Sequence, residues 1–146
     1  MVTCAGGLCA KRCGGTGCEG EGALELRRWD WVLAGDQASV RAARVLVAQS
    51  LPDVSRTSLE IVVLLTSELV TNAVHHGTGP VQLRLSRDDQ GVRVEVADES
   101  SERPVLRPID HDAHHGRGLL LVDALASGWG VDSDKTGKTV WFRLAW

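Results

Sequence analysis

The chain has 146 residues, enough for one compact domain with a hydrophobic core and too few for two of ordinary size. Its formal net charge is −3 and no block of lysine or arginine occurs, which argues against direct nucleic-acid binding, because phosphate neutralisation needs a concentrated basic surface. No apolar run approaches the length of a membrane span, and the start, MVTCAGGLCAKRC, lacks the apolar segment of a secretory signal. We therefore expect a cytoplasmic protein without membrane contact.

All four cysteines lie in the first eighteen residues, at Cys4, Cys9, Cys13 and Cys18. Their gaps differ from the Cys-x-x-Cys spacing of common zinc modules, although four thiolates this close could form a tetrahedral zinc site. The alternative is a glycine-rich tail whose cysteines stay reduced in the cytosol. We expect residues 1–22 to be a flexible tail of this kind and residues 23–146 to form the domain.

The first expected strand is LELRRWDWVL, which has β-prone aromatic and bulky apolar residues. Asp36 or Ser39 then caps a helix through VRAARVLVAQS, which ends at Pro52. A second, longer helix begins near residues 55–58 and runs to Gly77. After it, apolar residues alternate in VQLRL and again in VRVEV, with DDQG as the turn, which predicts a β-hairpin.

Residues 99–116 contain two prolines and many charges without a sustained period, which predicts a long loop that is either a functional lid or disordered. RGLLLVDALAS predicts a third helix, and GWGVDS and KTVWFRLAW predict two closing strands. This order of elements indicates an α+β fold. It is a two-layer α/β sandwich with helices on one face of a mixed, mostly antiparallel sheet.

The second helix carries Glu68 and Asn72 within SELVTNAVHHG. At 100° per residue they lie about 40° apart, in the same arc as Ile61, Leu64 and Leu65. Burying a carboxylate costs several kcal/mol unless something compensates for it. One explanation is a polar pair that links this helix to its neighbour. The other is a functional site, where perturbed carboxylates are concentrated.

Two further features follow in the chain. Asp98 continues the inward parity of VRVEV, so a second acid is expected to point into the interior, unless it only caps the next turn. Gly116 and Gly118 flank the start of the third helix, where backbone amides can approach a phosphate. A plain turn leading into the helix is the alternative for these glycines.

Taken in order, these features resemble the GHKL superfamily of histidine kinase-like ATPases, over about residues 23–146. ELVTNAVHHG is similar to its N-box, VEVADES to the segment with the adenine-reading aspartate, GRGLLLV to the second glycine box, and GKTVWFRL to the threonine-bearing last strand. The first glycine box departs from the usual Asp-x-Gly, because Ser100 stands in the glycine position. The resemblance implies the GHKL, or Bergerat, ATP-binding fold.

The resemblance also implies roles for single residues. Glu68 is the expected general base, Asn72 the Mg²⁺ ligand, and Asp98 the acceptor for the adenine amino group. These assignments agree with the residue types, since Mg²⁺ takes oxygen ligands and phosphoryl transfer needs a group that accepts the hydroxyl proton. The other nucleotide-contacting positions are expected to be His76, Gly116, Arg117, Gly118, Leu119 and Thr139, with the two glycines bordering the phosphates and the threonine supporting the adenine site.

The short form with ELVTNA followed by HG most resembles the anti-sigma-factor serine/threonine kinases. This implies a protein that binds ATP and Mg²⁺, phosphorylates an antagonist protein and binds a sigma factor, and that can form a homodimer. The main alternative is a regulatory module that binds ATP without transferring phosphate; the presence of Glu68 and Asn72 favours catalysis.

A histidine kinase and a zinc protein are weaker interpretations of the same sequence. The catalytic half of a histidine kinase would need a phosphoacceptor helix pair, and none precedes residue 23. A zinc-dependent protein would depend on the cysteine-rich tail. His111, His114 and His115 are interpreted as exposed loop histidines and not as a metal site, since no acid or cysteine lies at ligand spacing.

Overall fold

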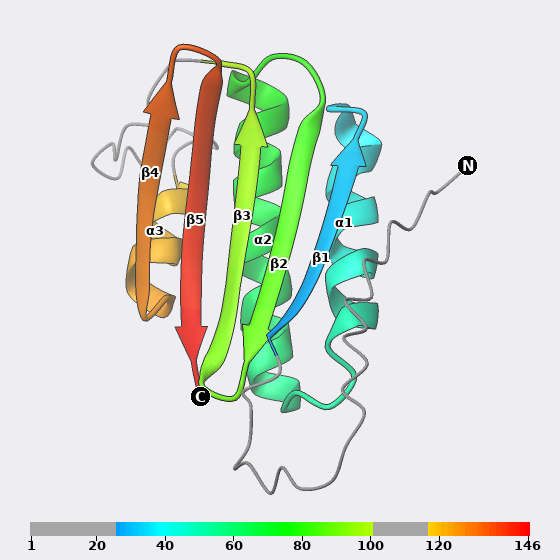
Figure 1. Ribbon diagram of the computed structural model, residues 1–146, viewed down its shortest axis with the longest axis vertical. Helices are drawn as coiled ribbons and strands as arrows, with labels where there is room; N and C mark the ends of the chain where they lie inside the picture. Colours follow the sequence, from blue (N-terminus) through cyan, green and yellow to red (C-terminus); the bar gives the residue numbers. More distant parts are fainter. Residues whose placement is uncertain (1–25, 101–116) are drawn as a thin grey trace, which may run out of the picture.

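The computed structural model describes residues 26–100 and 117–146 (Figure 1). Within these residues it contains the three helices and five strands expected from the sequence. The cysteine-rich tail, its boundary at residue 22 and the loop histidines lie outside the described residues. In chain order the elements are β1 (Arg27–Leu33), α1 (Gln37–Ser50), α2 (Arg56–His76), β2 (Val81–Asp88), β3 (Gly91–Asp98), α3 (Arg117–Leu125), β4 (Gly128–Asp134) and β5 (Gly137–Ala145).

The five strands form one sheet in the order β1-β2-β3-β5-β4. Every neighbouring pair of described strands is antiparallel, so the sheet that we expected to be mixed is antiparallel throughout. The helices all cover one face of the sheet, with α2 in the middle between α1 and α3 (Figure 1). This arrangement confirms the two-layer α+β fold.

Side-chain caps fix the ends of the two long helices. Asp36 and Ser39 form a capping box at the start of α1, in which the Ser39 backbone N–H donates to Asp36 Oδ1 at 3.0 Å. Ser55 caps α2 by accepting from the Ser58 backbone N–H at 3.1 Å. Gly77 ends α2, and its N–H donates to the Ala73 carbonyl at 2.9 Å. Caps of this kind stabilise a helix by about 1 kcal/mol, so α2 ends at a defined place beside the sheet.

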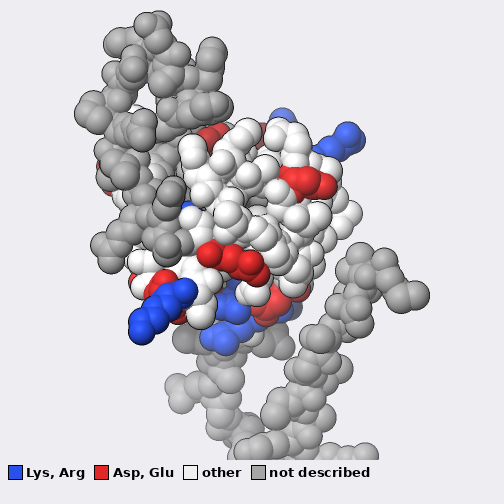
Figure 2. Space-filling view, turned by 90° about the horizontal axis from the view of Figure 1, so that it is seen from above, with Lys and Arg blue, Asp and Glu red and all other residues white. Residues whose placement is uncertain are grey.

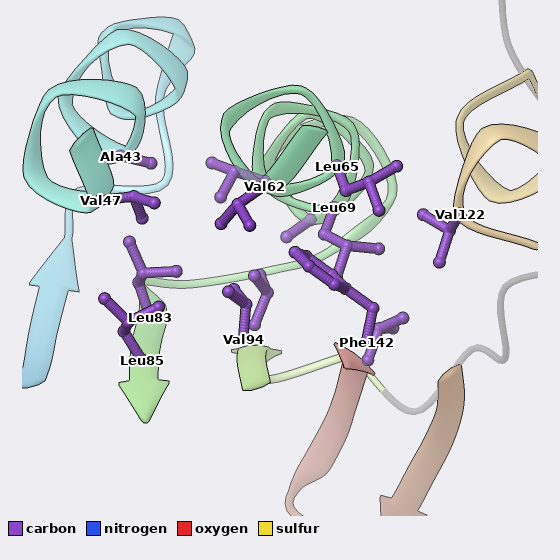
Figure 3. Close-up of a cluster of buried hydrophobic side chains, with 14 of the residues drawn as sticks. Ala43, Val47, Val62, Leu65, Leu69, Leu83, Leu85, Val94, Val122 and Phe142 are labelled. Atoms are coloured by element: carbon purple, nitrogen blue, oxygen red, sulfur yellow. The ribbon is translucent and has the colours of Figure 1, made fainter. Parts of the chain in front are cut away.

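The core fills the space between the helices and the inward rows of the strands. Phe142 of β5 is fully buried beneath α2 (Figure 3). The expected alternation in the hairpin is confirmed, because β2 and β3 each bury every second side chain along VQLRL and VRVEV. The residues labelled in Figure 3 come from all three helices and from β2, β3 and β5: Ala43, Val47, Val62, Leu65, Leu69, Leu83, Leu85, Val94, Val122 and Phe142.

α2 corrects the expectation that no segment of the chain is long and apolar enough to span a membrane. By length and composition, with a mean hydropathy of 1.3 over an 18-residue window, it is apolar enough to cross a membrane. Its buried residues Val62, Leu65 and Leu69 nevertheless pack against the sheet and form part of the core. A core helix of a globular protein has the same composition, so α2 is explained by its place in the fold.

The outer face of the sheet, opposite the helices, carries a ladder of charged side chains. Arg84 lies 2.6 Å from Asp30 and 3.5 Å from Glu95, measured between the bridging N and O atoms. Arg93 pairs with Glu95 at 3.0 Å and lies 3.9 Å above the ring of Trp141. Exposed pairs of this kind contribute about 1 kcal/mol or less each. Their main effect is to keep this face polar.

Candidate functional site

Glu68 and Asn72 lie one turn apart on α2, against the first turn of α3. A Cβ placed on Gly118 would lie 2.7 Å from Glu68 Oε2 and 3.5 Å from Asn72 Nδ2. Only glycine permits this approach without displacing the carboxylate. The structure therefore brings together three residues that come from two distant segments of the sequence and that were predicted to share a site.

The two side chains lie at the edge of the buried face of α2. The apolar residues around them are buried on one side of the arc and exposed on the other. Leu65 is fully buried, whereas Leu64 is 40 % exposed. Glu68 and Asn72 are consequently half-buried. Burial removes water from the carboxylate and raises the pKa of Glu68 above its ordinary value. A raised carboxyl pKa suits a group that must accept a proton.

Neither side chain makes a hydrogen bond with any residue that the structure describes. This weighs against the explanation that Glu68 and Asn72 form a polar link between helices, since such a link requires a bond between them or to a neighbouring element. Their polar atoms are instead available to a ligand or to water. The start of α3 adds backbone N–H groups, because the first turn of a helix leaves its amides without partners inside the helix.

Asp98 closes the inward row of β3 and is buried with only 5 % of its surface exposed. Its Oδ1 accepts from the Ser100 backbone N–H at 2.7 Å, which is the turn-capping role considered from the sequence. Its Oδ2 lies 3.3 Å from Nζ of Lys138, which is also buried. Asp98 and Lys138 are directly opposite one another in the register of β3 and β5.

The end of α2 meets Asp98. A Cβ on Gly77 would lie 2.7 Å from Asp98 Cγ, so the glycine that ends the helix also permits this contact. Gly77 is nine residues beyond Glu68, about 13 Å along the helix axis. An extended nucleoside triphosphate has a similar length. Asp98 and Glu68 thus lie at the two ends of a surface along α2 that is about as long as the nucleotide.

Lys138 is not among the residues predicted from the sequence motifs. The signal was present, because Lys138 has the same parity as Val140, Phe142 and Leu144, all of which point into the core. A buried lysine at the start of a strand, opposite an expected inward aspartate, could have been found by extending that parity by one step.

The structure places Thr139 beside Asp98 at the end of the sheet but not with Glu68 and Asn72 on the helix side. Thr139 belongs to the outward row of β5, and it lines a hollow of about 450 Å³ together with the outward-facing Gln82 and Ala97. Asp98 and Lys138 border the same hollow. Three more carboxylates line it, those of Glu99, Asp132 and Asp134. Seen from this end of the sheet, charged side chains of both signs lie among uncharged ones (Figure 2).

The remaining predicted positions divide into three kinds. His76 is exposed in the last turn of α2. Leu119 is buried in the core and can border a ligand only through its backbone. Arg117 is the first residue of α3, and Gly116 lies outside the described residues.

A metal site made of protein ligands alone is not found in the described part of the chain, where no three His, Cys, Asp or Glu side chains are grouped to hold an ion. A cation beside Asn72 would therefore take most of its ligands from phosphate oxygens and water. Mg²⁺ accepts such a ligand set, since it retains several waters in most protein sites.

Comparison with solved structures gives a match to the RsbU and RsbW domains of Rv1364c from Mycobacterium tuberculosis. The match has a TM-score of 0.64 and 20 % sequence identity, and it covers 81 % of this chain and 32 % of the other. This chain thus spans about a third of the length of the chain it matches, and at this identity the likeness establishes the fold. No curated protein sequence gives a significant match.

Comparison with protein families gives a match to the histidine kinase-like ATPase domain over residues 33–144. That range contains Glu68, Asn72, Asp98 and the start of α3. The resemblance inferred from the sequence motifs is therefore confirmed for family and fold. This chain belongs to the histidine kinase-like ATPase domain family.

Proposed function

We propose that the domain binds ATP with Mg²⁺ along α2 and transfers the γ-phosphate to a serine or threonine of a partner protein. The observation that carries the proposal is the approach of Gly118 to Glu68 and Asn72, which places a helix start beside a carboxylate with a raised pKa. Membership of the family supports ATP-dependent chemistry.

In this proposal residues along α2 and at its two ends contact different parts of the nucleotide. Asp98 accepts a hydrogen bond from the base at one end, and the backbone amides of the first turn of α3 face the phosphates at the other. Asn72 supplies a neutral oxygen ligand for Mg²⁺, which when bound offsets the phosphate charge. Glu68 accepts the proton of the attacking hydroxyl. A positioned base of this kind contributes about 10²–10⁴-fold in rate.

The proposed partners are a sigma factor and an antagonist protein that is the phosphate acceptor, and the protein acts in the cytoplasm. The ELVTNA and HG motifs support this assignment through their resemblance to anti-sigma-factor kinases. The fold likeness to an RsbW domain is in keeping with it.

The test is to incubate the full chain with γ-labelled ATP, Mg²⁺ and candidate antagonist proteins encoded near its gene. Transfer of label to a serine or threonine supports the kinase. Tight ATP binding without transfer to any candidate favours the regulatory module, which binds ATP and a partner only. Absence of ATP binding contradicts both functions.

A further inference from the structure

We propose that Lys138 reads the purine base together with Asp98, so that the site accepts a purine with a 6-oxo group as well as one with a 6-amino group. This inference rests on the proposed nucleotide site. It adds a specificity-determining residue to that site and widens the class of its substrate to purine nucleoside triphosphates, GTP and ITP included.

The first argument is the burial of the pair. The side chains of Lys138 and Asp98 are only 5 % and 2 % exposed, and Nζ lies 3.3 Å from Oδ2. Removing two charges from water costs more than such a pair commonly regains, and well-packed apolar residues of similar volume are often at least as stable. Stability alone therefore does not account for a lysine at this position, where the next inward residues of β5 are all apolar.

The second argument is unused hydrogen-bonding capacity. An ammonium has three donors, and among the described residues the one ion-pair partner of Lys138 is Asp98. A carboxylate has about four acceptor sites, of which the Ser100 N–H and Lys138 occupy two. The pair thus presents donors and acceptors side by side, next to the end of α2 at Gly77.

The third argument is the chemistry of the bases. Adenine presents a donor at its 6-amino group and an acceptor at the adjacent ring nitrogen, whereas guanine and hypoxanthine present an acceptor at O6 and a donor at N1–H. A lone carboxylate accepts from the adenine amino group but repels a 6-oxo group. A carboxylate with an ammonium beside it can satisfy either order, with Lys138 donating to O6 and Asp98 accepting from N1–H.

The experiment measures dissociation constants of ATP, GTP and ITP by calorimetry, with Mg²⁺ and the full unmodified chain. We expect ITP and GTP to bind within about tenfold of ATP, because each 6-oxo base gains a charge-assisted hydrogen bond from Lys138. ITP is included because it lacks the 2-amino group and so isolates the contact at O6. Rejection of both ITP and GTP by more than about 100-fold relative to ATP would overturn the inference.

The matched variants are Lys138→Met and Lys135→Met. Lys135 is exposed in the turn between β4 and β5, so its replacement removes the same charge without touching the site. Lys138→Met should raise the ratio of the ITP dissociation constant to the ATP dissociation constant by about 10–100-fold. This is the effect expected from losing one hydrogen bond to a charged group. Lys135→Met should leave the ratio unchanged.

An unchanged ratio in folded Lys138→Met would show that Lys138 only neutralises Asp98, and would overturn the inference while the proposed function stands. Failure of the unmodified chain to bind any of the three nucleotides would instead contradict the proposed function. Thermal unfolding shows whether Lys138→Met is folded. Where it is not, the nucleotide series on the unmodified chain decides, with Lys138→Gln as a second variant that keeps a donor without the charge.

Discussion

Replacing Gly118 by alanine should separate nucleotide binding from phosphate transfer. The new Cβ would lie 2.7 Å from Oε2 and 3.2 Å from Cβ of Glu68, whereas ordinary contacts begin at 3.4 Å. The carboxylate therefore has to move by about 0.7 Å, and a misplacement of about 1 Å at a reacting group costs roughly 100-fold in rate. The fold should survive, because the end of the Glu68 side chain can move and alanine is favoured over glycine in a helix by about 1 kcal/mol.

The assay follows label transfer from saturating ATP to the antagonist protein that the unmodified chain phosphorylates, alongside ATP calorimetry and thermal unfolding. Gly128→Ala is the matched control, since a Cβ on Gly128 would meet no atom within 4 Å. We expect transfer by Gly118→Ala to fall about 100-fold while ATP affinity changes little. Gly128→Ala should transfer phosphate at the parent rate.

A parent-like transfer rate in Gly118→Ala would refute the reasoning, because the position of the Glu68 carboxylate would then not matter for the reaction. Equal losses of transfer and of melting temperature in both glycine variants would point to general destabilisation, and the role assigned to the contact between α3 and α2 would be wrong.

Four more predictions concern Asn72, the effects of Glu68 titration on rate and on stability, and the core. Asn72→Ala should weaken ATP binding in the presence of Mg²⁺ and change it little in EDTA, because it removes a proposed metal ligand; calorimetry under both conditions measures this. The transfer rate should fall as the pH is lowered through the raised pKa of Glu68, because the protonated carboxyl cannot accept a proton, and a flat pH–rate profile would contradict this role. The same raised pKa means that the folded state binds the Glu68 proton more tightly than the unfolded chain does, so the protein loses stability as the pH rises above 4.5. Glu68→Gln should therefore be more stable than the parent at neutral pH but not below pH 4.5, as measured by urea unfolding. Phe142→Ala should lower the free energy of unfolding by about 3–5 kcal/mol, as it empties a fully buried site, whereas Arg143→Ala on the outer face should change it by about 0.5 kcal/mol or less, both measured by urea unfolding.

Local signals predicted most of the elements. Ser55 and Gly77 bound α2 as expected, because capping depends on residues within one turn of the helix end. The inward row of β3 follows from its alternation, which reflects the strand period of two. The order of the strands could not be predicted in this way. β5 lies between β3 and β4, and that placement depends on packing between distant segments.

At the candidate site, the periodicity of the sequence predicts less than it does for the helices and strands. A helical wheel placed Glu68 among apolar residues but could not show what covers them, and Leu64 proved exposed. The contact with Gly118 is non-local, so the sequence predicted it only through the family resemblance. The threonine of the last-strand motif, Thr139, lies in the outward row of β5, and the inward row begins with its neighbour Lys138.

The most direct test of the central claim compares Glu68→Gln with the parent chain in one transfer assay with ATP, Mg²⁺ and the protein substrate. The substitution keeps the volume of the side chain and removes a partly buried charge, so the fold and ATP binding should be retained. We predict that the variant binds ATP as the parent does and that transfer falls by about 10²–10⁴-fold. Transfer at the parent rate would show that Glu68 is a structural acid and would contradict the account.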